Sequence, residues 1–303
     1  MNYIEDQLKN YGDLELNTPL SKHTTFKIGG KARYFIYPNN EMALARVVEI
    51  CNENNVPYKA LGKGSNLLCH DDDFDGCIIN LDRYFTDCHF EEDGTCYAQA
   101  GVSIIFLARL AMQKGFSGLE FASGIPATLG GTIFMNAGAY KSSMSDIVKK
   151  VYVLKNGIYE WMDLEELDYS YRHSIFQSHR DWIIVGAHLK LEKGDQKEIK
   201  NLMDSRRQRR LDTQPLDKPS AGSVFRNHEL HPAWKLIDEI GYRGKQIGGA
   251  KVSEKHSNFI VNEDHAKAVD VFTLATEIQE KVKETFGIEL KMEVERFNWP
   301  NQK

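Results

Sequence analysis

The sequence lacks the features that mark membrane, secreted and disulfide-rich proteins. Its 303 residues contain no apolar run approaching the ~20 residues that span a bilayer, and the polar start MNYIEDQLKN is not a signal peptide. The cysteines are odd in number, form no CxxC pair and stand in apolar or strand-like contexts: Cys51, Cys69, Cys77, Cys88 and Cys96. We therefore expect reduced thiols in a cytoplasmic protein, with neither a disulfide framework nor a metal site.

An excess of positive charge is also missing. The chain has 38 Lys and Arg against 43 Asp and Glu, a net charge of -5, which argues against a general affinity for nucleic acid. The hydrophobic share of 42% and the charged share of 27% are those of an ordinary globular enzyme. A chain of this length is sufficient for two or three domains.

Three motifs of nucleotide-binding and hydrolytic enzymes are absent. ALGKGSNLL (60–68) is not GxGxxG, because Leu67 occupies the third glycine position, and no GxxxxGK[ST] occurs. SAGSVFRN (220–227) is not the GxSxG elbow of a serine hydrolase. These absences exclude the most direct assignments to a dinucleotide fold, a P-loop enzyme or an esterase.

Periodicity predicts a mixed α and β chain. We expect a mixed, largely helical lead-in over 1–27, a β-α-β unit over 31–61, and a hairpin over 149–164 that turns at Asn156-Gly157. Further strands are predicted at 76–81, 95–101, 181–195, 256–262 and 289–297, and helices at 103–115, 197–211, 231–241 and 264–287. The Pro-, Asp- and Ser-rich stretch 212–223 predicts a domain boundary.

Two glycine-rich loops are candidates for binding a nucleotide cofactor. One is ALGKGSNLL, directly after a predicted strand, and the other is ASGIPATLGGTIFMNAGAY (122–140), which contains no Lys or Arg. Backbone N–H groups of such loops can bind a pyrophosphate without a cationic side chain. The alternative is that the glycines serve tight turns only.

Charged windows leave two interpretations open. Arg172 in YRHSIFQ (171–177) is either a surface arginine or a ligand for an anion, and SRRQRR (205–210) is either a solvated helix face or a diphosphate-binding stretch. Glu293 and Glu295 would share one face of the last strand, either in solvent or in a site.

Ser223 follows Ala-Gly and precedes an apolar pair, so it stands on a turn. It can be a nucleophile, a structural turn residue or a proton donor. His173, His228, His231 and His256 show no spacing that suggests a Ser-His pair. Taken alone, these sequence segments predict a protein that binds a nucleotide cofactor.

In this order the windows resemble the UDP-N-acetylenolpyruvoylglucosamine reductase family. The resemblance extends over nearly the whole chain and rests on LSKHTTFKIGGKA (20–32), LGKGSNLL (61–68), ASGIPATLGGTIFMNAGAY, YRHSIFQ, SAGSVFRN, LIDEIGYRGKQIGGAKVSEKHSNFIVN (236–262) and MEVERF (292–297). It implies an α+β fold of the vanillyl-alcohol-oxidase type. Two FAD-binding subdomains (1–80 and 81–212) would precede a C-terminal α+β substrate-binding domain (213–303), whose last strand can return to the flavin site.

The resemblance also implies site residues. Arg172, Ser223 and Glu293 match the catalytic positions, and Tyr171, Arg226 and Asn227 are predicted to bind substrate. FAD is predicted to contact Gly62, Lys63, Gly64, Ser65, Asn66, Ser123, Gly124, Ile125, Gly130, Gly131, Asn136, Ala137 and Gly138. The chain resembles the shorter type of the family, which lacks an inserted loop with a substrate-clamping tyrosine, and Lys251, His256 and Asn258 are candidates for that region.

The implied reaction uses FAD and NADPH to reduce the enolpyruvyl ether of UDP-N-acetylglucosamine to UDP-N-acetylmuramate, a cytoplasmic step of peptidoglycan precursor synthesis. Hydride would come from flavin N5, and Ser223 would supply the proton. Arg172 and a protonated Glu293 would stabilise the charge that develops on the substrate. No nucleic acid or membrane partner is expected, and the sequence leaves the oligomeric state open, a monomer included.

Three other functions remain to be separated from this one. An oxidase on the same flavin fold would react rapidly with oxygen, and a flavin- or nucleotide-sugar-binding module would not need Arg172, Ser223 and Glu293 together. A serine hydrolase would need the missing elbow.

Overall fold

The computed structural model describes residues 3–300, which form two compact units, each with its own hydrophobic core. The first unit comprises residues 3–17, Arg33–Lys63 and Asp75–Gln208, and the second comprises Thr18–Ala32, Gly64–Phe74 and residues 209–300. The second unit therefore combines two short segments from the first quarter of the chain with the C-terminal part of the chain. The expected three-part division at residues 80 and 212 stays a prediction.

A four-stranded sheet lies mainly in the first unit, in the order β1-β2-β5-β3. Its strands are β1 (Gly12–Pro19), β2 (Lys31–Pro38), β5 (Phe74–Asn80) and β3 (Tyr58–Leu61), and the last two run parallel. The helix α2 (Glu41–Glu53) connects β2 to β3, which confirms the predicted β-α-β unit. Its first turn is capped by Asn40, whose Oδ1 accepts from the backbone N–H of Ala43 at 2.8 Å.

The predicted helical lead-in is wrong beyond its first turns. Within residues 3–27, α1 (Tyr3–Leu8) is the only α-helix and Leu20–Lys22 form a short 3-10 helix, whereas the chain between them contains strand β1, which pairs with β2. A Cβ at Gly12 would lie 2.1 Å from the carbonyl oxygen of Tyr37 in β2. The close approach of the two chains thus depends on glycine, and a partner strand decides a conformation that local sequence left ambiguous.

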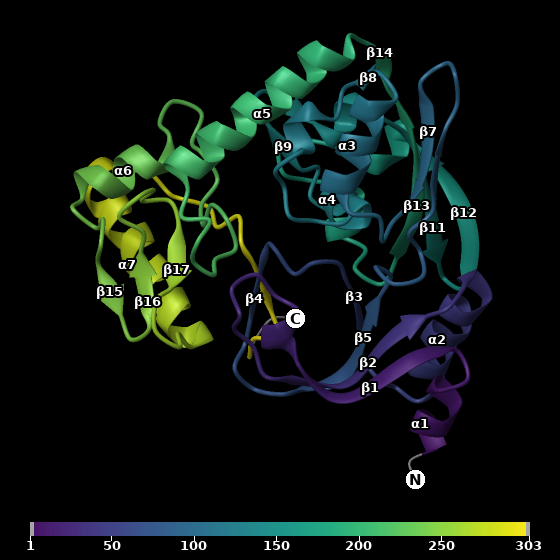
Figure 1. Ribbon diagram of the computed structural model, residues 1–303. Helices are drawn as coiled ribbons and strands as arrows, with labels where there is room; N and C mark the ends of the chain where they lie inside the picture. The colour runs from purple at the N-terminus through teal and green to yellow at the C-terminus, as the bar shows by residue number, and fades with distance from the viewer. Residues whose placement is uncertain (1–2, 301–303) are drawn as a thin grey trace. The chain divides into compact units, whose positions relative to one another are not determined.

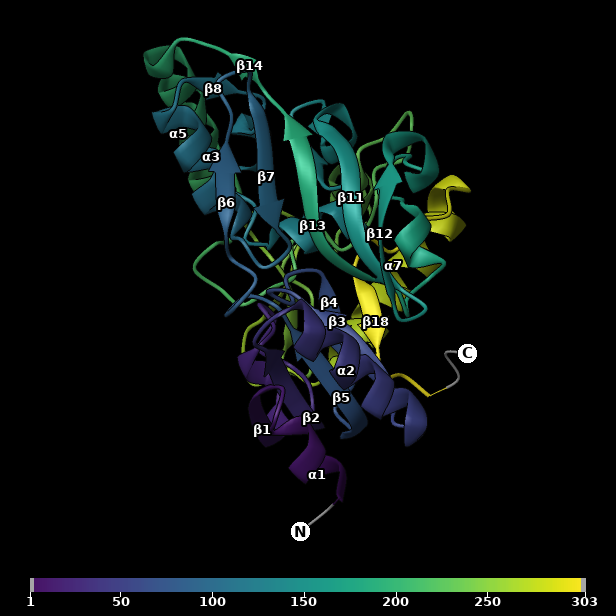
Figure 2. The ribbon, with the colours of Figure 1, turned by 90° about the vertical axis from the view of Figure 1, so that its right-hand side faces the viewer.

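A five-stranded sheet with the order β12-β11-β13-β7-β6 completes the first unit, and Figure 2 shows it side by side with α3. Its strands are β12 (Ile158–Asp163), β11 (Val148–Lys155), β13 (Ile183–Lys190), β7 (Thr95–Gln99) and β6 (Cys88–Phe90). The β11–β12 hairpin turns at Asn156 and Gly157, with φ of 52° and 80°, as predicted from this dipeptide. Helices α3 (Ile104–Gln113) and α4 (Leu129–Phe134) and the short strands β8 (Phe116–Ser117), β9 (Gly138–Ala139), β10 (Ser142–Ser143) and β14 (Glu192–Lys193) complete this unit.

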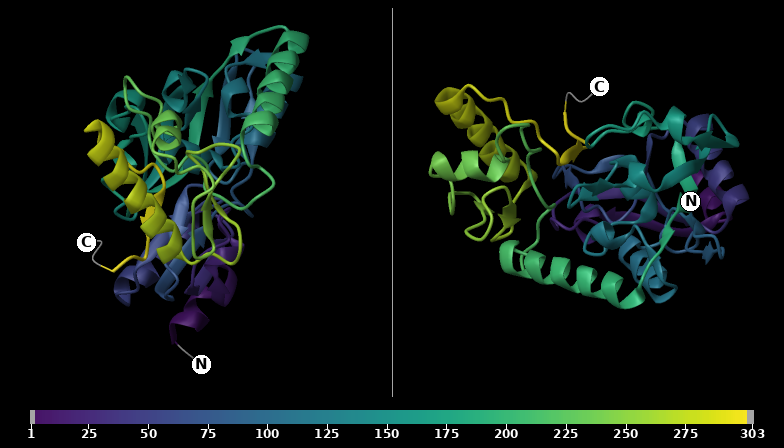
Figure 3. Two further views of the ribbon diagram at one scale, coloured as in Figure 1. Left: turned by 90° about the vertical axis from the view of Figure 1, so that its left-hand side faces the viewer. Right: turned by 90° about the horizontal axis from the view of Figure 1, so that it is seen from above.

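In the second unit, α7 (Ala268–Phe286) lies along a three-stranded sheet, as Figures 1 and 3 show. The sheet contains β15 (Gln246–Ile247), β16 (Ala250–Val252) and β17 (Ile260–Asn262), and α6 (Ala233–Glu239) precedes it. A separate parallel pair is formed by β4 (Leu67–Cys69) and β18 (Glu295–Phe297). The predicted strands 256–262 and 289–297 are thus shortened to their last three residues.

The predicted basic helix is confirmed as α5 (Gln196–Thr213), the long green helix in Figure 3. Ile199 is its single fully buried residue, and the boundary between the two units falls near its end. All five cysteines are free thiols, as predicted. Within residues 3–300, each helix is too short or too polar for a membrane span.

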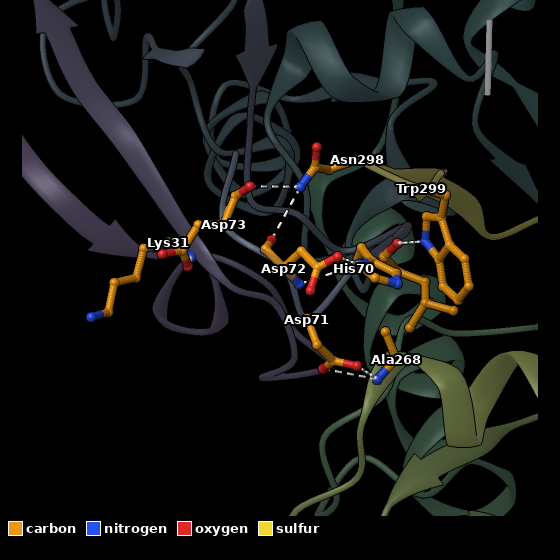
Figure 4. Close-up of polar contacts among 9 residues, drawn as sticks. Lys31, His70, Asp71, Asp72, Asp73, Ala268, Asn298 and Trp299 are labelled. Carbon is orange, nitrogen blue, oxygen red and sulfur yellow. Dashed lines mark hydrogen bonds and ion pairs between the residues drawn. The ribbon is translucent and has the colours of Figure 1, made fainter. Parts of the chain in front are cut away.

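The C-terminal segment of the second unit is fixed to the loop after β4, as Figure 4 shows. The indole Nε1 of Trp299 donates to the carbonyl oxygen of Leu68 at 3.0 Å, and its ring packs edge-on against His70. The side chain of Asn298 donates to the carbonyl oxygens of Asp72 and Asp73 at 3.1 and 3.3 Å. These contacts follow directly on β18 and hold the segment that carries Glu293 and Glu295.

The same loop caps α7. Both carboxylate oxygens of Asp71 accept from the backbone N–H of Ala268, at 3.1 and 2.9 Å, which stabilises a helix start with an acceptor and a negative charge. This explains why α7 begins at Ala268 and not at the predicted residue 264.

We expect Asp71→Ala to lower the free energy of unfolding by about 1 kcal/mol, the usual value of a lost helix cap. Asp71→Asn retains an acceptor and should lose less. Urea unfolding followed by circular dichroism measures both, with Asp75→Ala, an exposed partner of Arg33, as the matched control. Equal midpoints for Asp71→Ala and this control would contradict the capping role.

Candidate active site

The second unit brings Ser223 and Glu293 together. The backbone N–H of Glu293 donates to the carbonyl oxygen of Val224 at 2.8 Å. Phe225 pairs with Met292 in an antiparallel bridge, and Arg226 N–H donates to Lys291 at 2.9 Å. Residues 224–226 and 291–293, about seventy residues apart in sequence, therefore run side by side. Ser223 directly precedes the first of these segments, and Glu293 belongs to the second.

The expected strand partnership of Glu293 with Glu295 is wrong. The strand β18 begins at Glu295 and pairs with Leu67 of β4, whereas Glu293 bonds to Val224. The alternation that predicted one shared face holds only within a regular strand. Glu293 instead belongs to the neighbourhood of Ser223.

The hydroxyl of Ser223 is half-buried and makes no hydrogen bond to any histidine among residues 3–300. The residue before it, Gly222, has a φ of 78°, a left-handed conformation that favours glycine. The left-handed turn at Gly222 therefore presents Ser223.

Asn66 connects the first glycine-rich loop to Glu293. Its side-chain Nδ2 donates to the carbonyl oxygen of Glu293 at 3.0 Å, and its own carbonyl oxygen accepts from Glu295 N–H at 2.9 Å. Nearby in the same unit, Thr25 N–H donates to the carbonyl oxygen of Gly64 at 3.4 Å. The hydroxyl oxygen of Thr25 is buried and has no partner within residues 3–300, so it is free to bond to a bound group.

We expect Gly64→Ala to disrupt this loop. Gly64 has a φ of 59°, and a Cβ there would lie 2.2 Å from the carbonyl oxygen of His23. The strained backbone costs about 1–3 kcal/mol, and the clash with backbone adds to that cost. The purified variant should carry much less flavin absorbance per polypeptide than the wild type.

The matched control is Gly157→Ala, at the hairpin turn between β11 and β12. Gly157 also has a positive φ, 80°, but nothing lies within 4 Å of the position of its Cβ. Backbone strain is thus common to the two variants, whereas the clash is confined to Gly64. Full flavin content in Gly64→Ala would show that this loop does not bind the cofactor.

In the first unit, the glycines of the two loops pack closely. A Cβ at Gly62 would lie 2.5 Å from the hydroxyl oxygen of Thr128, one at Gly130 would lie 3.0 Å from the Cβ of Ala100, and one at Gly138 would lie 2.5 Å from the carbonyl oxygen of Ser142. Gly62 directly follows β3, and Thr128 precedes α4. The end of the first loop therefore meets the second loop, as a shared binding surface requires.

Several predicted cofactor residues are already engaged. Lys63 pairs with Asp82 at 2.5 Å. Asn136 is buried, accepts from Ser145 N–H at 3.0 Å and donates to the carbonyl oxygen of Ser170 at 2.9 Å. Both side chains therefore hold loops of the first unit, so their contact with a cofactor would come from backbone groups.

The remaining loop residues lie at two turns of the first unit. Ser123, Gly124 and Ile125 follow a short 3-10 helix and are half-buried, whereas Gly131 is inside α4, where its N–H donates to the Thr128 hydroxyl at 3.3 Å. Ala137 N–H donates to the carbonyl oxygen of Thr132 at 2.8 Å. Their role in binding FAD stays a prediction.

Arg172 belongs to the first unit and is held at both backbone and side chain. Its Nη2 donates to the carbonyl oxygen of Gly138 at 2.8 Å, and its own carbonyl oxygen accepts from Gln177 at 3.0 Å. Its φ of 58° is uncommon for a residue with a side chain and is found preferentially at functional positions. The guanidinium carbon lies 5.3 Å from the ring centre of Tyr171, whose exposed fraction is 56%.

The predicted substrate residues of the second unit include two unusual polar groups. Arg226 has a buried Nε without a partner among residues 3–300. The Oδ1 of Asn227 accepts from Ala233 N–H at 3.1 Å and so caps α6, which leaves the amide Nδ2 as a donor. Both groups can donate hydrogen bonds to an anionic ligand.

Comparisons with known proteins show which family this chain belongs to. The family model of the UDP-N-acetylenolpyruvoylglucosamine reductase C-terminal domain matches residues 214–297, and that of an FAD binding domain matches residues 32–158. A reductase of this name from Anoxybacillus flavithermus is 42% identical over 94% of this chain and 95% of its own. The chain belongs to the UDP-N-acetylenolpyruvoylglucosamine reductase family. Another member, from Caldanaerobacter subterraneus, is 43% identical over 96% of this chain and 97% of its own.

A solved structure of the family supports the fold. The UDP-N-acetylenolpyruvylglucosamine reductase of Thermus caldophilus superimposes with a TM-score of 0.80 at 33% identity, over 95% of this chain and 99% of that chain. The predicted α+β flavin-binding fold is thereby confirmed, and the chain is an oxidoreductase with an FAD-binding domain.

The residues of this chain fit FAD. Within the described range 3–300, the backbone N–H groups of Gly62, Lys63, Gly64 and Ser65 have no hydrogen-bond acceptor. Successive unpaired N–H groups suit a pyrophosphate, and the orphaned hydroxyl of Thr25 lies beside Gly64. The contacts of Thr25 with Gly64 and of Thr128 with Gly62 were not predicted, because nothing in a threonine's local sequence indicates which loop it will meet.

Proposed function

We propose that this protein reduces the enolpyruvyl ether of UDP-N-acetylglucosamine to UDP-N-acetylmuramate with NADPH, a step of peptidoglycan precursor synthesis. Family membership supports the reaction class. The observation that supports the assignment is the 2.8 Å bond from the backbone N–H of Glu293 to the carbonyl oxygen of Val224, the residue that directly follows Ser223.

Residues 62–66 and 123–138 would hold FAD, chiefly through backbone N–H groups. FAD, when bound, accepts hydride from NADPH and supplies it to the outer alkene carbon of the substrate. The reduction then needs a proton on the inner carbon and stabilisation of the negative charge that grows on the carboxylate.

Ser223 would supply that proton. The enolate formed on the substrate is strongly basic, so a neutral hydroxyl is a sufficient acid if it is held in place. Gly222 allows the turn that presents the hydroxyl, and no histidine among residues 3–300 competes for its proton by hydrogen bonding.

Arg172 and Glu293 would stabilise the carboxylate side of the intermediate. A guanidinium is permanently charged and binds a carboxylate with two parallel hydrogen bonds. Glu293 helps only in its protonated form, because a carboxylate there would repel the intermediate. Arg226 and the Nδ2 of Asn227 would donate to the diphosphate of the substrate.

The test is a pair of half-reactions followed by flavin absorbance without oxygen. One equivalent of NADPH should bleach the bound flavin, and the enolpyruvyl nucleotide sugar should then restore the oxidised bands. Bleaching without restoration would leave the flavin fold intact and refute the substrate. Absence of flavin after reconstitution with FAD would refute the interpretation of both loops.

An oxidase on the same fold is separated by a parallel measurement. Turnover of NADPH in air without the nucleotide sugar should be slow compared with turnover in its presence. Equal rates would favour the oxidase.

A further inference from the structure

The segment that carries Ser223 is bonded on two sides. On one side Val224 and Arg226 bond to the segment of Glu293, as described above. On the other side Val224 N–H donates to the backbone carbonyl oxygen of Asn258 at 2.8 Å. The position of Ser223 relative to Glu293 thus depends on the groups that hold Val224 on the side of Asn258.

The side chain of Asn258 completes that side. Its Oδ1 accepts from Phe225 N–H at 3.0 Å, and its Nδ2 donates to the carbonyl oxygen of Phe225 at 2.9 Å. The amide therefore pairs with Phe225 as a strand neighbour would. Asn258 is 3% exposed, so water does not replace these bonds.

Asn258 is itself fixed by its own turn. Its backbone N–H donates to Nδ1 of His256 at 3.3 Å, and Ser253 N–H donates to the carbonyl oxygen of Phe259 at 2.8 Å. Burial lowers the pKa of His256, with Arg243 as a further cause and Asp238 acting in the opposite direction. The neutral ring keeps Nδ1 available as an acceptor.

On the N-terminal side of Ser223, among residues 3–300, Ala221 is buried in the core, and the nearest backbone bond is that from Asn262 N–H to the carbonyl oxygen of Pro219 at 2.9 Å. The backbone at Gly222 is left-handed, and no heavy atom lies within 4 Å of the position its Cβ would take. A glycine in open space restrains the chain little. The direction of the Ser223 side chain is therefore set from Val224 and Phe225, which Asn258 holds.

We propose that Asn258 is a positioning residue for proton transfer, which fixes the backbone after Ser223 so that its hydroxyl stays aligned beside Glu293. The proposal rests on the proposed role of Ser223 as proton donor. It also replaces the expectation that Asn258 covers the substrate, because the side-chain amide of Asn258 is buried and hydrogen-bonded to Phe225. Lys251, another candidate for that cover, pairs with Glu254 at 2.7 Å.

Asn258→Asp tests the proposal, because the carboxylate has the shape of the amide but cannot donate to Phe225. A protonated carboxyl can both accept and donate, so lowering the pH should restore the hydrogen bonds to Phe225.

In the FAD-loaded Asn258→Asp protein, bleaching by NADPH should stay within about twofold of wild type. Reoxidation by saturating enolpyruvyl nucleotide sugar should slow about 10–100-fold at pH 8, as small misplacements of reacting groups do. The ratio of variant to wild-type rates should recover toward pH 6, where the carboxyl at position 258 gains its proton.

Ser257→Ala is the matched control. Ser257 is the buried neighbour of Asn258, and its hydroxyl donates to the carbonyl oxygen of Trp234 at 2.7 Å, with no bond to residues 223–226. This variant should lose stability but keep the reoxidation rate within about twofold. If Asn258→Asp fails to fold, Asn258→Ala buries no charge and should show the same loss of rate without recovery at low pH.

A second readout does not depend on activity. Amide hydrogen exchange in the peptide with Val224 and Phe225 should rise in Asn258→Asp and Asn258→Ala but not in Ser257→Ala. Wild-type reoxidation rates with unchanged exchange would overturn the proposal, as would an equal loss of rate in Ser257→Ala. If the wild type itself is not reoxidised, the proposed function fails, and exchange at Val224 and Phe225 alone decides the positioning role.

Discussion

Ser223→Ala should slow reoxidation of the reduced flavin by the enolpyruvyl nucleotide sugar by about 10²–10⁴-fold, the usual contribution of a positioned general acid. Bleaching by NADPH should be nearly unchanged, because that step needs no proton from Ser223. The hydroxyl is presented by the turn at Gly222 and is bonded to no histidine among residues 3–300. Rapid mixing without oxygen measures the two steps separately.

The control for Ser223→Ala is Ser220→Ala, which removes a half-buried hydroxyl from the same segment, before the turn at Gly222. It should leave both steps close to wild type. Equal losses in the two half-reactions of Ser223→Ala would mean that the substitution disturbs the flavin and not the proton transfer, and would contradict the assignment.

Arg172→Ala should slow the same step by about 10²–10³-fold, the usual loss when one donor to a developing anion is removed. Arg172→Lys should recover little of this, since an ammonium keeps the charge but not the planar fork. The bond from Nη2 to Gly138 and the bond from Gln177 to the carbonyl oxygen hold the guanidinium in place in the wild type. Single-turnover reoxidation over a range of sugar concentrations measures the maximal rate and the affinity separately.

Arg33→Ala is the control for Arg172, because Arg33 is an exposed arginine of the same unit that pairs with Asp75 at 2.9 Å. Such surface pairs contribute little to stability, so both half-reactions should be unaffected. If Arg172→Lys loses as little rate as Arg33→Ala, the planar fork of the Arg172 guanidinium is not needed for this step. That result would contradict the expected role of its two parallel hydrogen bonds.

Local sequence patterns were sufficient to predict the structure where residues close together in sequence form it. The hairpin at Asn156-Gly157 formed as predicted, because a two-residue turn needs left-handed residues that Asn and Gly supply. The helix α2 followed from apolar spacing and the Asn40 cap. The end of α7 at Gly287, with φ of 71°, followed from the same preference at helix C-termini.

Predictions failed where distant segments decide the conformation. Residues 12–19 are a strand because β2 lies beside them, and α7 starts late because Asp71 supplies its cap. Glu293 leaves the predicted strand because its N–H bonds to Val224. In each case the partner belongs to another segment of the chain, outside the stretch whose periodicity gave the prediction.

The sequence by itself determined the family, the residue types of the site and most of the elements, because motifs and hydrophobic periods are local properties of the chain. Only the tertiary structure decided that Glu293 bonds to Val224, that Asn66 bonds to the Glu293 backbone, and that a buried Asn258 bonds to Phe225. Buried polar groups must find hydrogen-bond partners. Which partner each group finds depends on which segments fold together, and no single stretch of sequence contains that information.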